Sequence, residues 1–555
     1  MTATTEERGS GAGLKRHVGV VGLLFASVGS IIGSGWLFGA LNASIEAGPA
    51  AIISWALGGF MILLIALVYA ELGTMFPLSG GVVRFPHLAF GSFASYAAGW
   101  ITWVAVATTA PIEVEAALQY ATKYAPFTRE HMVDGEVVHT LTGLGYASAV
   151  VLMAVFVVIN YYGIKWFARI NNVLVWWKIA IILLVIAAFM VSAFHTENFT
   201  DYGFMPEGWH GVFTAIATSG IVFSYLGFRQ GIELAGETDN PRRNVPIAVV
   251  GSVLLTALIY ILLQVAFIAA LPQSTLADSG SWSQLSFEGD FGPLAAIATL
   301  LGLGWLSVLL YADAIISPAD TGLIYTTVTS RISYAMARNG NAPQALARTT
   351  DRGVPFISLI VTFVVGLIVF LPFPSWQQLV GFITSATVLS FASGPLVLSA
   401  LRKQLPDQER PFRVPGGHLI PLLAFWASNL IIYWSGWDIV WKLGVAVAIG
   451  FVLLPIYHVL GQDTPKLDFR SGATWVVPWL LGLLLISWLG NYPEPAKGNQ
   501  DVLTFGTAIP VIFVFSVIIY VLALRFPLST AEIEAHVEES RKESELEEAT
   551  LGEAP

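Results

Sequence analysis

Apolar segments long enough to cross a lipid bilayer recur along this chain of 555 residues. A crossing helix needs about 20 apolar residues, and fourteen segments meet this length. Only 12% of the residues are charged, whereas a soluble domain carries about 25%. The sequence therefore predicts an all-α polytopic membrane protein with about 14 transmembrane helices, and it excludes a soluble enzyme, a disordered chain and a nucleic-acid-binding protein. The segments lie near 18–42, 48–76, 92–121, 142–163, 170–194, 211–237, 246–271, 301–331, 354–372, 376–401, 418–437, 439–460, 473–490 and 504–525.

Basic residues predict the orientation, because cytoplasmic loops carry an excess of Lys and Arg. In the fourteen-segment layout, one side holds only Lys123, Arg129 and Lys497. Both termini then lie on the other, cytoplasmic side, which requires an even number of crossings, although twelve or thirteen crossings stay open as alternatives. The basic residues on the predicted cytoplasmic side are Lys15, Arg16, Arg84, Lys165, Arg169, Arg242, Arg243, Arg338, Arg348, Arg352, Arg402, Lys403, Arg410, Arg413, Lys466, Arg470 and Arg525.

The two ends of the chain are polar. Residues 1–17 are expected to form a cytoplasmic segment, and no cleavable signal is expected because the apolar run that follows is too long for one. Residues 526–555 are expected to form a disordered acidic cytoplasmic tail, since 531–555 contain nine Glu and carry seven of the ten net negative charges. Residues 292–300 are expected to form a short extracellular helix. The chain has no cysteine, which excludes disulfides and thiol chemistry.

Glycine and serine interrupt two of the apolar segments. The first contains Ser30-Ile31-Ile32-Gly33-Ser34-Gly35-Trp36, and the sixth contains Phe223-Ser224-Tyr225-Leu226-Gly227-Phe228-Arg229-Gln230-Gly231. Interruptions at matching places in two groups of five segments are typical of inverted-repeat transporters. A broken helix leaves backbone groups without partners in the membrane, where a substrate or ion can satisfy them. The alternative is that these glycines only allow close packing of helices.

Four motifs resemble those of the amino acid–polyamine–organocation (APC) superfamily of permeases. They are GSIIGSGWLFG at 29–39, ELAGETDNPRRNVPIA at 233–248, SRISYAMARNGNAP at 330–343 and RPFRVPGG at 410–417. The resemblance covers about 18–460. It implies a leucine-transporter-type fold with a five-plus-five inverted repeat and broken helices 1 and 6. Residues 18–401 would form this transport core (helices 1–10), and 402–525 would form peripheral helices 11–14.

Three shorter stretches resemble the bacterial aspartate–proton symporter subgroup more narrowly. They are GSGWLFG at 33–39, IEVEAALQYA at 112–121 and GFRQGIELAGE at 227–237. The two additional C-terminal helices also resemble this subgroup. This finer resemblance implies an acidic amino acid as the substrate.

The two interruptions are the predicted substrate site. The amides of Gly33, Ser34 and Gly35 begin the second half of helix 1, where the positive end of the helix dipole favours a carboxylate. By resemblance, the carbonyls of Ile31, Phe223 and Ser224 face the substrate ammonium. For Ser34 the alternative is a hydroxyl bonded within its own helix. The remaining predicted substrate contacts are Thr109, Tyr225, Gly227, Arg229 and Tyr325.

Arg229 is the most informative of these residues. A charge at membrane depth is costly and needs a partner, and a guanidinium can hold a carboxylate through two hydrogen bonds. Arg229 could therefore select an acidic side chain. The alternatives are an ion pair with Glu233, four residues further along the helix, and a gating role. Glu71, at the end of the second segment, is expected to form a gating or structural ion pair.

Polar residues in three other helices are the predicted proton-coupling site. An intramembrane carboxylate at Glu113 could carry the proton. Glu115, two residues further, points to a different face, so only one of the two is expected to face the central cavity, with Glu113 favoured; the alternative is that the helix ends near Pro111 and both acids are hydrated. By resemblance, Lys178 takes the place of a bound sodium ion in proton-coupled relatives; the alternative is a lysine that reaches the membrane surface. Asp320 and Thr321 complete the predicted site, with Asp320 as a partner for Lys178 or a proton carrier.

These features predict a secondary active amino-acid transporter and not an enzyme. The favoured function is symport of aspartate or glutamate with protons across the plasma membrane. Coupling to sodium is less favoured. The alternatives are an amino acid exchanger or a carrier of neutral or cationic amino acids, and less so a channel, a sensor or a membrane-embedded enzyme. The expected partners are an amino acid, protons and the lipid bilayer, with no nucleic acid. Cofactor and metal sites are not expected, because the histidines show no metal-ligand spacing and no nucleotide-binding motif occurs. The oligomeric state stays open.

Overall fold

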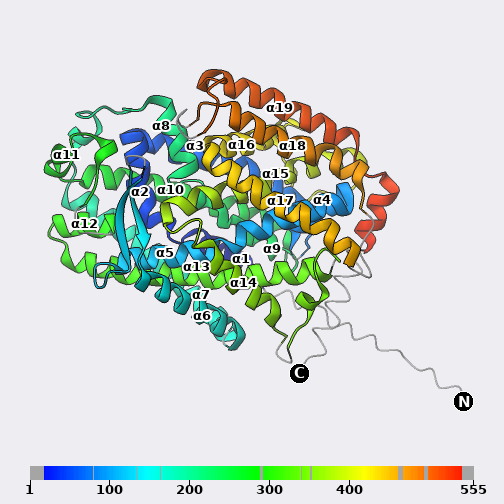
Figure 1. Cartoon of the computed structure of the whole chain (residues 1–555), viewed down its shortest axis with the longest axis horizontal. Coiled ribbons are helices and arrows are strands. Elements are labelled where there is room, and N and C mark those ends of the chain that lie inside the picture. Colours follow the sequence, from blue (N-terminus) through cyan, green and yellow to red (C-terminus); the bar gives the residue numbers. More distant parts are fainter. Residues whose placement is uncertain are drawn as a thin grey trace, which may run out of the picture.

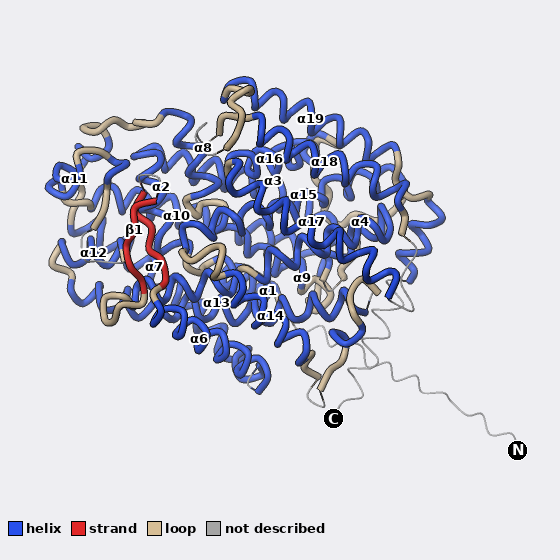
Figure 2. Tube along the Cα trace, in the orientation of Figure 1, coloured by secondary structure: helices blue, strands red, loops and turns tan. Residues whose placement is uncertain are grey.

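The computed structural model describes a helical protein with one two-stranded hairpin (Figures 1 and 2). The described residues are 18–78, 80–133, 136–162, 164–287, 292–338, 340–350, 353–460, 467–492 and 498–539. The expected N-terminal segment 1–17 lies outside them, as do residues 540–555 of the expected tail.

Helices make up most of the described chain, and the single hairpin lies between the fifth and sixth of the α-helices. In chain order, the main elements are α1 (Val20–Ile31), α2 (Gly35–Ala47), α3 (Ala51–Met75), α4 (Gly81–Ala107), α5 (Thr109–Ala121), β1 (Thr128–Val133), β2 (Glu136–Leu141), α6 (Gly143–Tyr162), α7 (Ile164–Ser192), α8 (Gly208–Thr218), the 3-10 helix η3 (Phe223–Arg229), α9 (Gln230–Glu233), α10 (Pro241–Ala270), α11 (Gln273–Ser279), α12 (Pro293–Leu300), α13 (Gly304–Arg338), α14 (Phe356–Val369), α15 (Trp376–Gln404), α16 (Leu419–Trp434), α17 (Trp437–Leu460), α18 (Phe469–Leu489) and α19 (Phe505–Arg525).

Each of the fourteen predicted apolar segments contains at least one of these helices. In the described part of the chain, ten helical spans are long and apolar enough to cross a membrane, or eleven if the bent pair of α8 with η3 and α9 counts as one. Three apolar helices are shorter: α1, α14 and α16. The structure thus bears out a multi-pass helical membrane protein, while the count of fourteen crossings and the inverted repeat stay predictions. The expected short helix at 292–300 is present as α12.

Breaks divide three of the predicted segments. Residues 32–34 separate α1 from α2, as the sequence predicts. In the sixth segment the break lies a few residues earlier than predicted, because Gly220 adopts a left-handed backbone conformation with φ 87°. The helix axis bends there by 45°, and the predicted interruption is itself the 3-10 helix η3. The third break was not predicted: α4 ends and α5 begins at Thr108.

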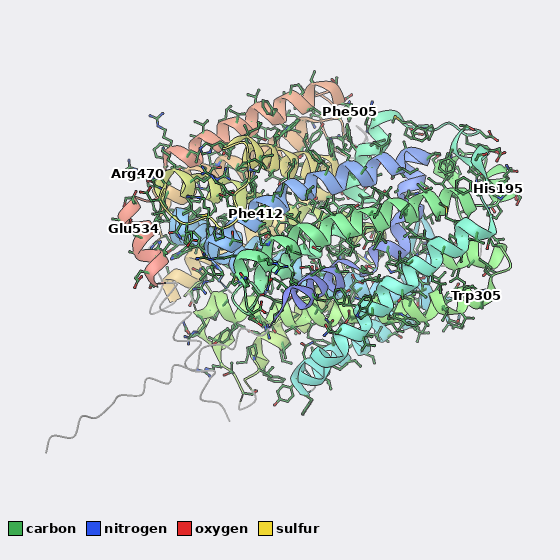
Figure 3. All side chains as sticks on the ribbon, turned by 180° about the vertical axis from the view of Figure 1, so that it is seen from behind. His195, Trp305, Phe412, Arg470, Phe505 and Glu534 are labelled. Carbon is green, nitrogen blue, oxygen red and sulfur yellow. The ribbon has the colours of Figure 1, made fainter. Side chains whose placement is uncertain are left out.

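Helix α15 is buried at every residue from Leu379 to Leu401 and packs against α3, α4 and α16. By contrast, α6, α7, α14, α17, α18 and α19 expose many apolar side chains, as helices that contact lipid do. In Figure 3, Arg470 and Glu534 lie at one end of the bundle, and His195 and Trp305 lie at the opposite end. The orientation stays a prediction, in which the end that holds Arg470 is the cytoplasmic one.

The beginning of the expected tail is structured, which corrects that part of the prediction. Residues 530–539 are helical, Ile533 is fully buried, and the Leu528 amide donates a hydrogen bond to the Ala89 carbonyl at 3.1 Å. The ring of His536 stacks on His87 with centroids 4.4 Å apart. The prediction rested on the net charge of the whole tail. It did not consider the apolar pair Ile533 and Val537, which lie one helical turn apart and pack against the core.

A buried ion-pair network joins α3 to α15 and the loop after it. Glu71 is fully buried and is paired with Arg402, whose Nε donates to Glu71 Oε1 at 2.9 Å. Arg410 Nε lies 3.6 Å from the same carboxylate, and the Val414 amide donates to it at 2.7 Å. One carboxylate therefore fixes both arginines and the loop backbone.

We expect Glu71→Gln to destabilise the protein by about 3–5 kcal/mol, because it leaves two largely buried guanidinium groups without their counter-charge. The measurement is the apparent Tm of the purified protein in detergent. The matched control is Arg242→Ala, which breaks an ion pair with Glu409 whose side chains are 65% and 64% exposed; such pairs contribute about 0–1 kcal/mol. Equal Tm values for both variants would contradict a structural role for Glu71.

Candidate functional site

The two predicted helix breaks lie directly against each other. Gly227 in η3 has no room for a side chain: an added Cβ would overlap the backbone of Ser30 and Ile31 at the end of α1. Gly35, at the start of α2, is packed in the same way against the side chain of Ser224. Glycine at these positions lets the two broken helices approach at backbone distance.

A small buried cavity lies between the breaks. Its volume is about 10 Å³, which is enough for about one water molecule. An amino acid therefore fits only after the surrounding helices separate. The lining residues come from the helix breaks, α5, α13 and α15: Ser30, Ile31, Gly33, Thr109, Glu113, Phe223, Leu226, Gly227, Tyr325, Ile383 and Thr387.

Seven of the predicted site residues line this cavity, namely Ile31, Gly33, Thr109, Glu113, Phe223, Gly227 and Tyr325. Ser224 and Tyr225 direct their hydroxyls elsewhere, to the carbonyls of Gly220 at 2.7 Å and Trp55 at 3.2 Å. Thr109 lines the cavity, but its hydroxyl bonds to the Ala105 carbonyl at 3.1 Å. These three hydroxyls are therefore bound by main-chain carbonyls, and the apolar residues Phe223, Leu226 and Ile383 line the cavity beside Glu113 and Tyr325.

The start of α2 already holds a carboxylate. The Ser34 amide donates to Glu113 Oε2 at 2.8 Å, at the place where the sequence predicts the substrate carboxylate. The Ser34 hydroxyl accepts a hydrogen bond from Trp376 Nε1 at 2.8 Å, so it is not bonded only within its own helix. Trp376 begins α15 and was missed by sequence reasoning, because tryptophan is common in membrane helices and nothing in the local pattern marks it.

Lys178 on α7 is fully buried, which argues against the alternative that it reaches the membrane surface. Its Nζ lies 2.6 Å from Asp320 Oδ2, 3.0 Å from the Gly29 carbonyl and 3.2 Å from Thr321 Oγ1. Thr321 Oγ1 in turn donates to the Ile32 carbonyl at 3.3 Å. One ammonium therefore joins α7, α13 and the broken end of α1.

A second buried carboxylate on α13 lies two helical turns before Asp320. Asp313 accepts hydrogen bonds from Trp177 Nε1 at 2.8 Å and from Ser317 Oγ at 2.8 Å. The adjacent residues Trp177 and Lys178 thus each bind a carboxylate of the same helix. Asp313 was not predicted as a site residue, although its spacing of seven residues from Asp320 places the two on one helix face.

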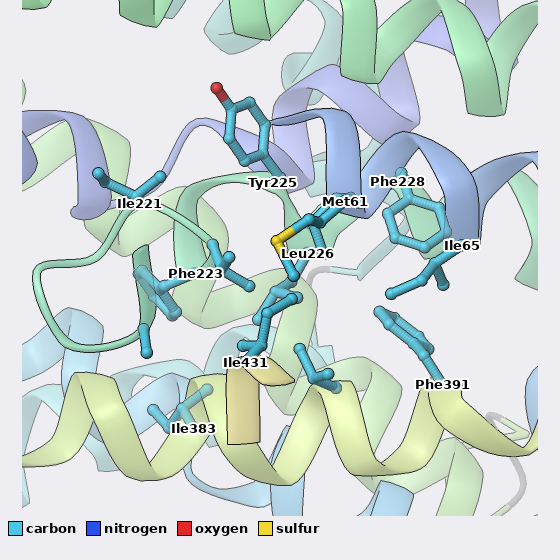
Figure 4. Packing of buried hydrophobic residues seen from close by; sticks show 14 of the residues in the cluster. Met61, Ile65, Ile221, Phe223, Tyr225, Leu226, Phe228, Ile383, Phe391 and Ile431 are labelled. Atoms are coloured by element: carbon cyan, nitrogen blue, oxygen red, sulfur yellow. The ribbon is translucent and has the colours of Figure 1, made fainter. Parts of the chain in front are cut away.

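Arg229 forms the ion pair that the sequence allowed as an alternative, with Nη2 3.0 Å from Glu233 Oε1. Its side chain is 1% exposed, and Nε and Nη1 find no hydrogen-bond partner among the described residues. The guanidinium lies 5.8 Å from the ring of Phe391, in the apolar layer that contains Phe228 and Ile65 (Figure 4). Arg229 does not line the cavity; Tyr325 lies close enough to interact electrostatically with both Arg229 and Glu113.

Glu115 faces another side of α5 than Glu113. It is 2% exposed, both its oxygens lack a hydrogen-bond partner among the described residues, and it interacts electrostatically with Tyr146 on α6. It therefore lies outside the cavity between the helix breaks.

Gly227→Ala should abolish transport while Gly506→Ala leaves it intact. The added methyl group at Gly227 meets the backbone of α1, which cannot rotate away as a side chain can, and such overpacking costs about 1–3 kcal/mol or more. At Gly506 in α19 the same Cβ meets no atom within 4 Å. The measurement is uptake of radiolabelled amino acids into proteoliposomes, with apparent Tm as a check on folding. Full uptake by Gly227→Ala would show that the close contact is not required.

Comparison with known sequences places the chain in a family. The family model described as "Amino acid permease" matches residues 18–467. The glutamate/serine transporter AimA of Bacillus subtilis is 39% identical over 520 residues, which is 92% of this chain and 94% of that protein. The aspartate-proton symporter of the same organism is 36% identical over 485 residues, 86% of this chain and 91% of that protein. The branched-chain amino acid permease BcaP, also from this organism, is 26% identical over 466 residues, 82% of this chain and 95% of that protein. This chain therefore belongs to the amino acid permease family, within the APC superfamily.

Proposed function

We propose that this protein carries an acidic amino acid, aspartate or glutamate, across the plasma membrane together with protons. Two relatives, named as a glutamate/serine transporter and an aspartate-proton symporter, support this proposal. In this proposal the first ten membrane helices, at 18–401, form a five-plus-five inverted repeat, helices 11–14 at 402–525 are peripheral, and both termini are cytoplasmic.

The substrate main chain would bind between the helix breaks. Its α-carboxylate would accept hydrogen bonds from the amides of Gly33, Ser34 and Gly35 at the start of α2, where the helix dipole favours a negative charge. Its ammonium would face the carbonyls of Ile31, Phe223 and Ser224. Thr109 and Tyr325 would complete the walls. Binding requires the cavity to widen, since its present volume is about 10 Å³.

One observation carries the choice of an acidic substrate: Arg229 is buried at 1% exposure with two nitrogens that lack hydrogen-bond partners among the described residues. Glu233 holds Nη2 only. A buried donor without a partner is costly. Each planar fork of a guanidinium pairs Nη2 with either Nε or Nη1, so a second carboxylate could accept from one of these two free nitrogens together with the second N–H of Nη2. Widening of the cavity past Tyr325 would bring the substrate side chain to this group.

Proton coupling would depend on Lys178, Asp320, Thr321 and Glu113. Lys178 binds the carbonyl of Gly29 and the hydroxyl of Thr321, and oxygen ligands of this kind suit a cation. A lysine there supplies a built-in positive charge, so that no sodium ion is needed. Movement of a proton among Lys178, Asp320 and Glu113 would then alter the contacts that hold the broken end of α1 to α13.

Uptake by the purified protein in liposomes tests the proposal. We expect radiolabelled L-aspartate and L-glutamate to accumulate when a proton gradient is directed inward and sodium is omitted, because protons supply the driving force. A protonophore should abolish the accumulation. Accumulation that requires sodium would contradict proton coupling, and no flux of either amino acid would contradict the acidic substrate.

Arg229→Ala combined with Glu233→Gln should remove the preference for acidic substrates. The double substitution avoids leaving an unpaired buried carboxylate, which would itself destabilise the protein. We expect aspartate and glutamate uptake to fall at least tenfold while uptake of a neutral amino acid such as serine persists, since about 1.4 kcal/mol of lost binding gives a tenfold change. Glu233→Gln alone is the matched control. It removes the counter-charge of the guanidinium but leaves an amide oxygen that can accept from Nη2, so the fraction that folds, checked by apparent Tm, should keep acidic uptake. A double variant that still prefers aspartate would rule out substrate contact by Arg229.

The relative named a glutamate/serine transporter favours a second candidate, a carrier that also accepts a neutral amino acid or exchanges one amino acid for another. Liposomes loaded with unlabelled serine distinguish the two. Flux that depends on internal amino acid and not on the proton gradient would indicate exchange.

A further inference from the structure

Glu113 is bound by the main chain at the start of α2. Its Oε2 accepts the Ser34 amide at 2.8 Å, the side chain is 1% exposed, and Oε1 lacks a hydrogen-bond partner among the described residues. A Cβ added to Gly33 would lie 2.6 Å from Oε1, so the carboxylate rests directly on the helix break. Glu113 also lines the cavity. The chain thus fills the proposed substrate-carboxylate position with a carboxylate of its own.

Two carboxylates cannot both occupy this position in their charged forms. The start of α2, a helix of 13 residues, offers one N-terminal dipole and few free amides, which favour a single anion. Like charges in contact repel strongly in an apolar interior, where no water screens them. A substrate carboxylate that binds the Ser34 amide must therefore displace Glu113 or find it uncharged.

Among the residues that the structure describes, the groups around Glu113 supply no positive charge besides Lys178. The titratable side chains that interact with it electrostatically are Lys178 on α7, Asp320 and Tyr325 on α13 and Tyr260 on α10. The charge of Lys178 is already balanced by Asp320 at 2.6 Å. A displaced Glu113 carboxylate would be left in an apolar interior without a counter-charge, which is strongly unfavourable. A proton is the simplest means of neutralising it.

We infer that Glu113 is a built-in competitor of the substrate, which yields the Ser34 amide to the substrate α-carboxylate only when it binds a proton. This inference rests on the proposed function and assigns the coupling step to one hydrogen bond. Outside, one proton binds Glu113, the hydrogen bond from the Ser34 amide to Oε2 breaks, and the same amide donates to the substrate. Inside, the substrate leaves, Glu113 releases the proton to the cytoplasm, and its carboxylate accepts the Ser34 amide again. One substrate and one proton cross in each cycle.

The test is the affinity of the purified full-length protein for radiolabelled L-aspartate and L-glutamate from about pH 5 to about pH 9. For the wild type, the Kd should rise by up to about tenfold per pH unit in the upper part of this range, because binding takes up one proton. Glu113→Gln should bind with a Kd that no longer changes with pH. Glu115→Gln is the matched control on the same helix and should keep the wild-type slope.

A second variant keeps the test decisive if Glu113→Gln does not fold. Glu113→Asp keeps the charge, but its side chain is one methylene shorter and holds the Ser34 amide less well, so the substrate should bind more tightly near neutral pH than to the wild type. Proton uptake by wild-type protein on substrate addition, measured in weakly buffered solution, should approach one per substrate bound. A wild-type pH slope in Glu113→Gln, or an affinity of Glu113→Asp no higher than that of the wild type, would overturn the inference alone. Failure of the wild type to bind either amino acid at any pH would overturn the proposed function as well.

Discussion

The structure depends on how the chain satisfies backbone polar groups where helices break inside an apolar protein. An interrupted helix loses hydrogen bonds that lipid cannot replace, so each break needs partners from elsewhere in the chain. At the α1–α2 break these partners are side chains: Glu113 accepts the Ser34 amide, Lys178 donates to the Gly29 carbonyl, and Thr321 donates to the Ile32 carbonyl. The break is therefore held by α5, α7 and α13 together. All three of these side chains are buried, and two of them, Glu113 and Lys178, are ionisable.

Charge balance explains which of these contacts are fixed and which can change. Lys178 is paired with Asp320, Arg229 with Glu233, and Arg402 with Glu71. A buried pair of this kind resists the removal of either partner, because the remaining charge would stay in an apolar interior. Glu113 differs from these carboxylates: among the described residues it has an amide in place of a cation as its hydrogen-bond partner. Another carboxylate can take the place of Glu113 on the Ser34 amide at a lower free-energy cost than breaking an ion pair. Among these contacts, the one made by Glu113 is therefore the most easily exchanged.

The sequence predicted the helical architecture well because its signals are local. A run of about 20 apolar residues indicates a membrane helix without reference to the rest of the fold, and each of the fourteen predicted segments contains a helix. Gly227 and Arg229 stood out for the same reason, since glycine and charge are unusual inside apolar segments. The features that the sequence did not predict depend on tertiary contacts. The break in the sixth segment lies at Gly220, where the ring of Trp376, distant in sequence, packs against it. Spacing likewise placed Glu113 on its own helix face, but it could not show that this side chain reaches an amide 79 positions away.

These contacts also indicate how a binding event could be transmitted through the fold. Glu113 connects α5 to the start of α2, while Lys178 and Thr321 connect α7 and α13 to the end of α1. The two halves of the broken helix are thus tied to different neighbours across a gap of three residues, 32–34. Release of the Glu113 contact removes one tie at the start of α2 and leaves α1 attached to Lys178, while Gln264 and Tyr120 still bind α2 further along. The proposed exchange of the Glu113 hydrogen bond would therefore act on the start of α2 and not on the contacts that hold the end of α1.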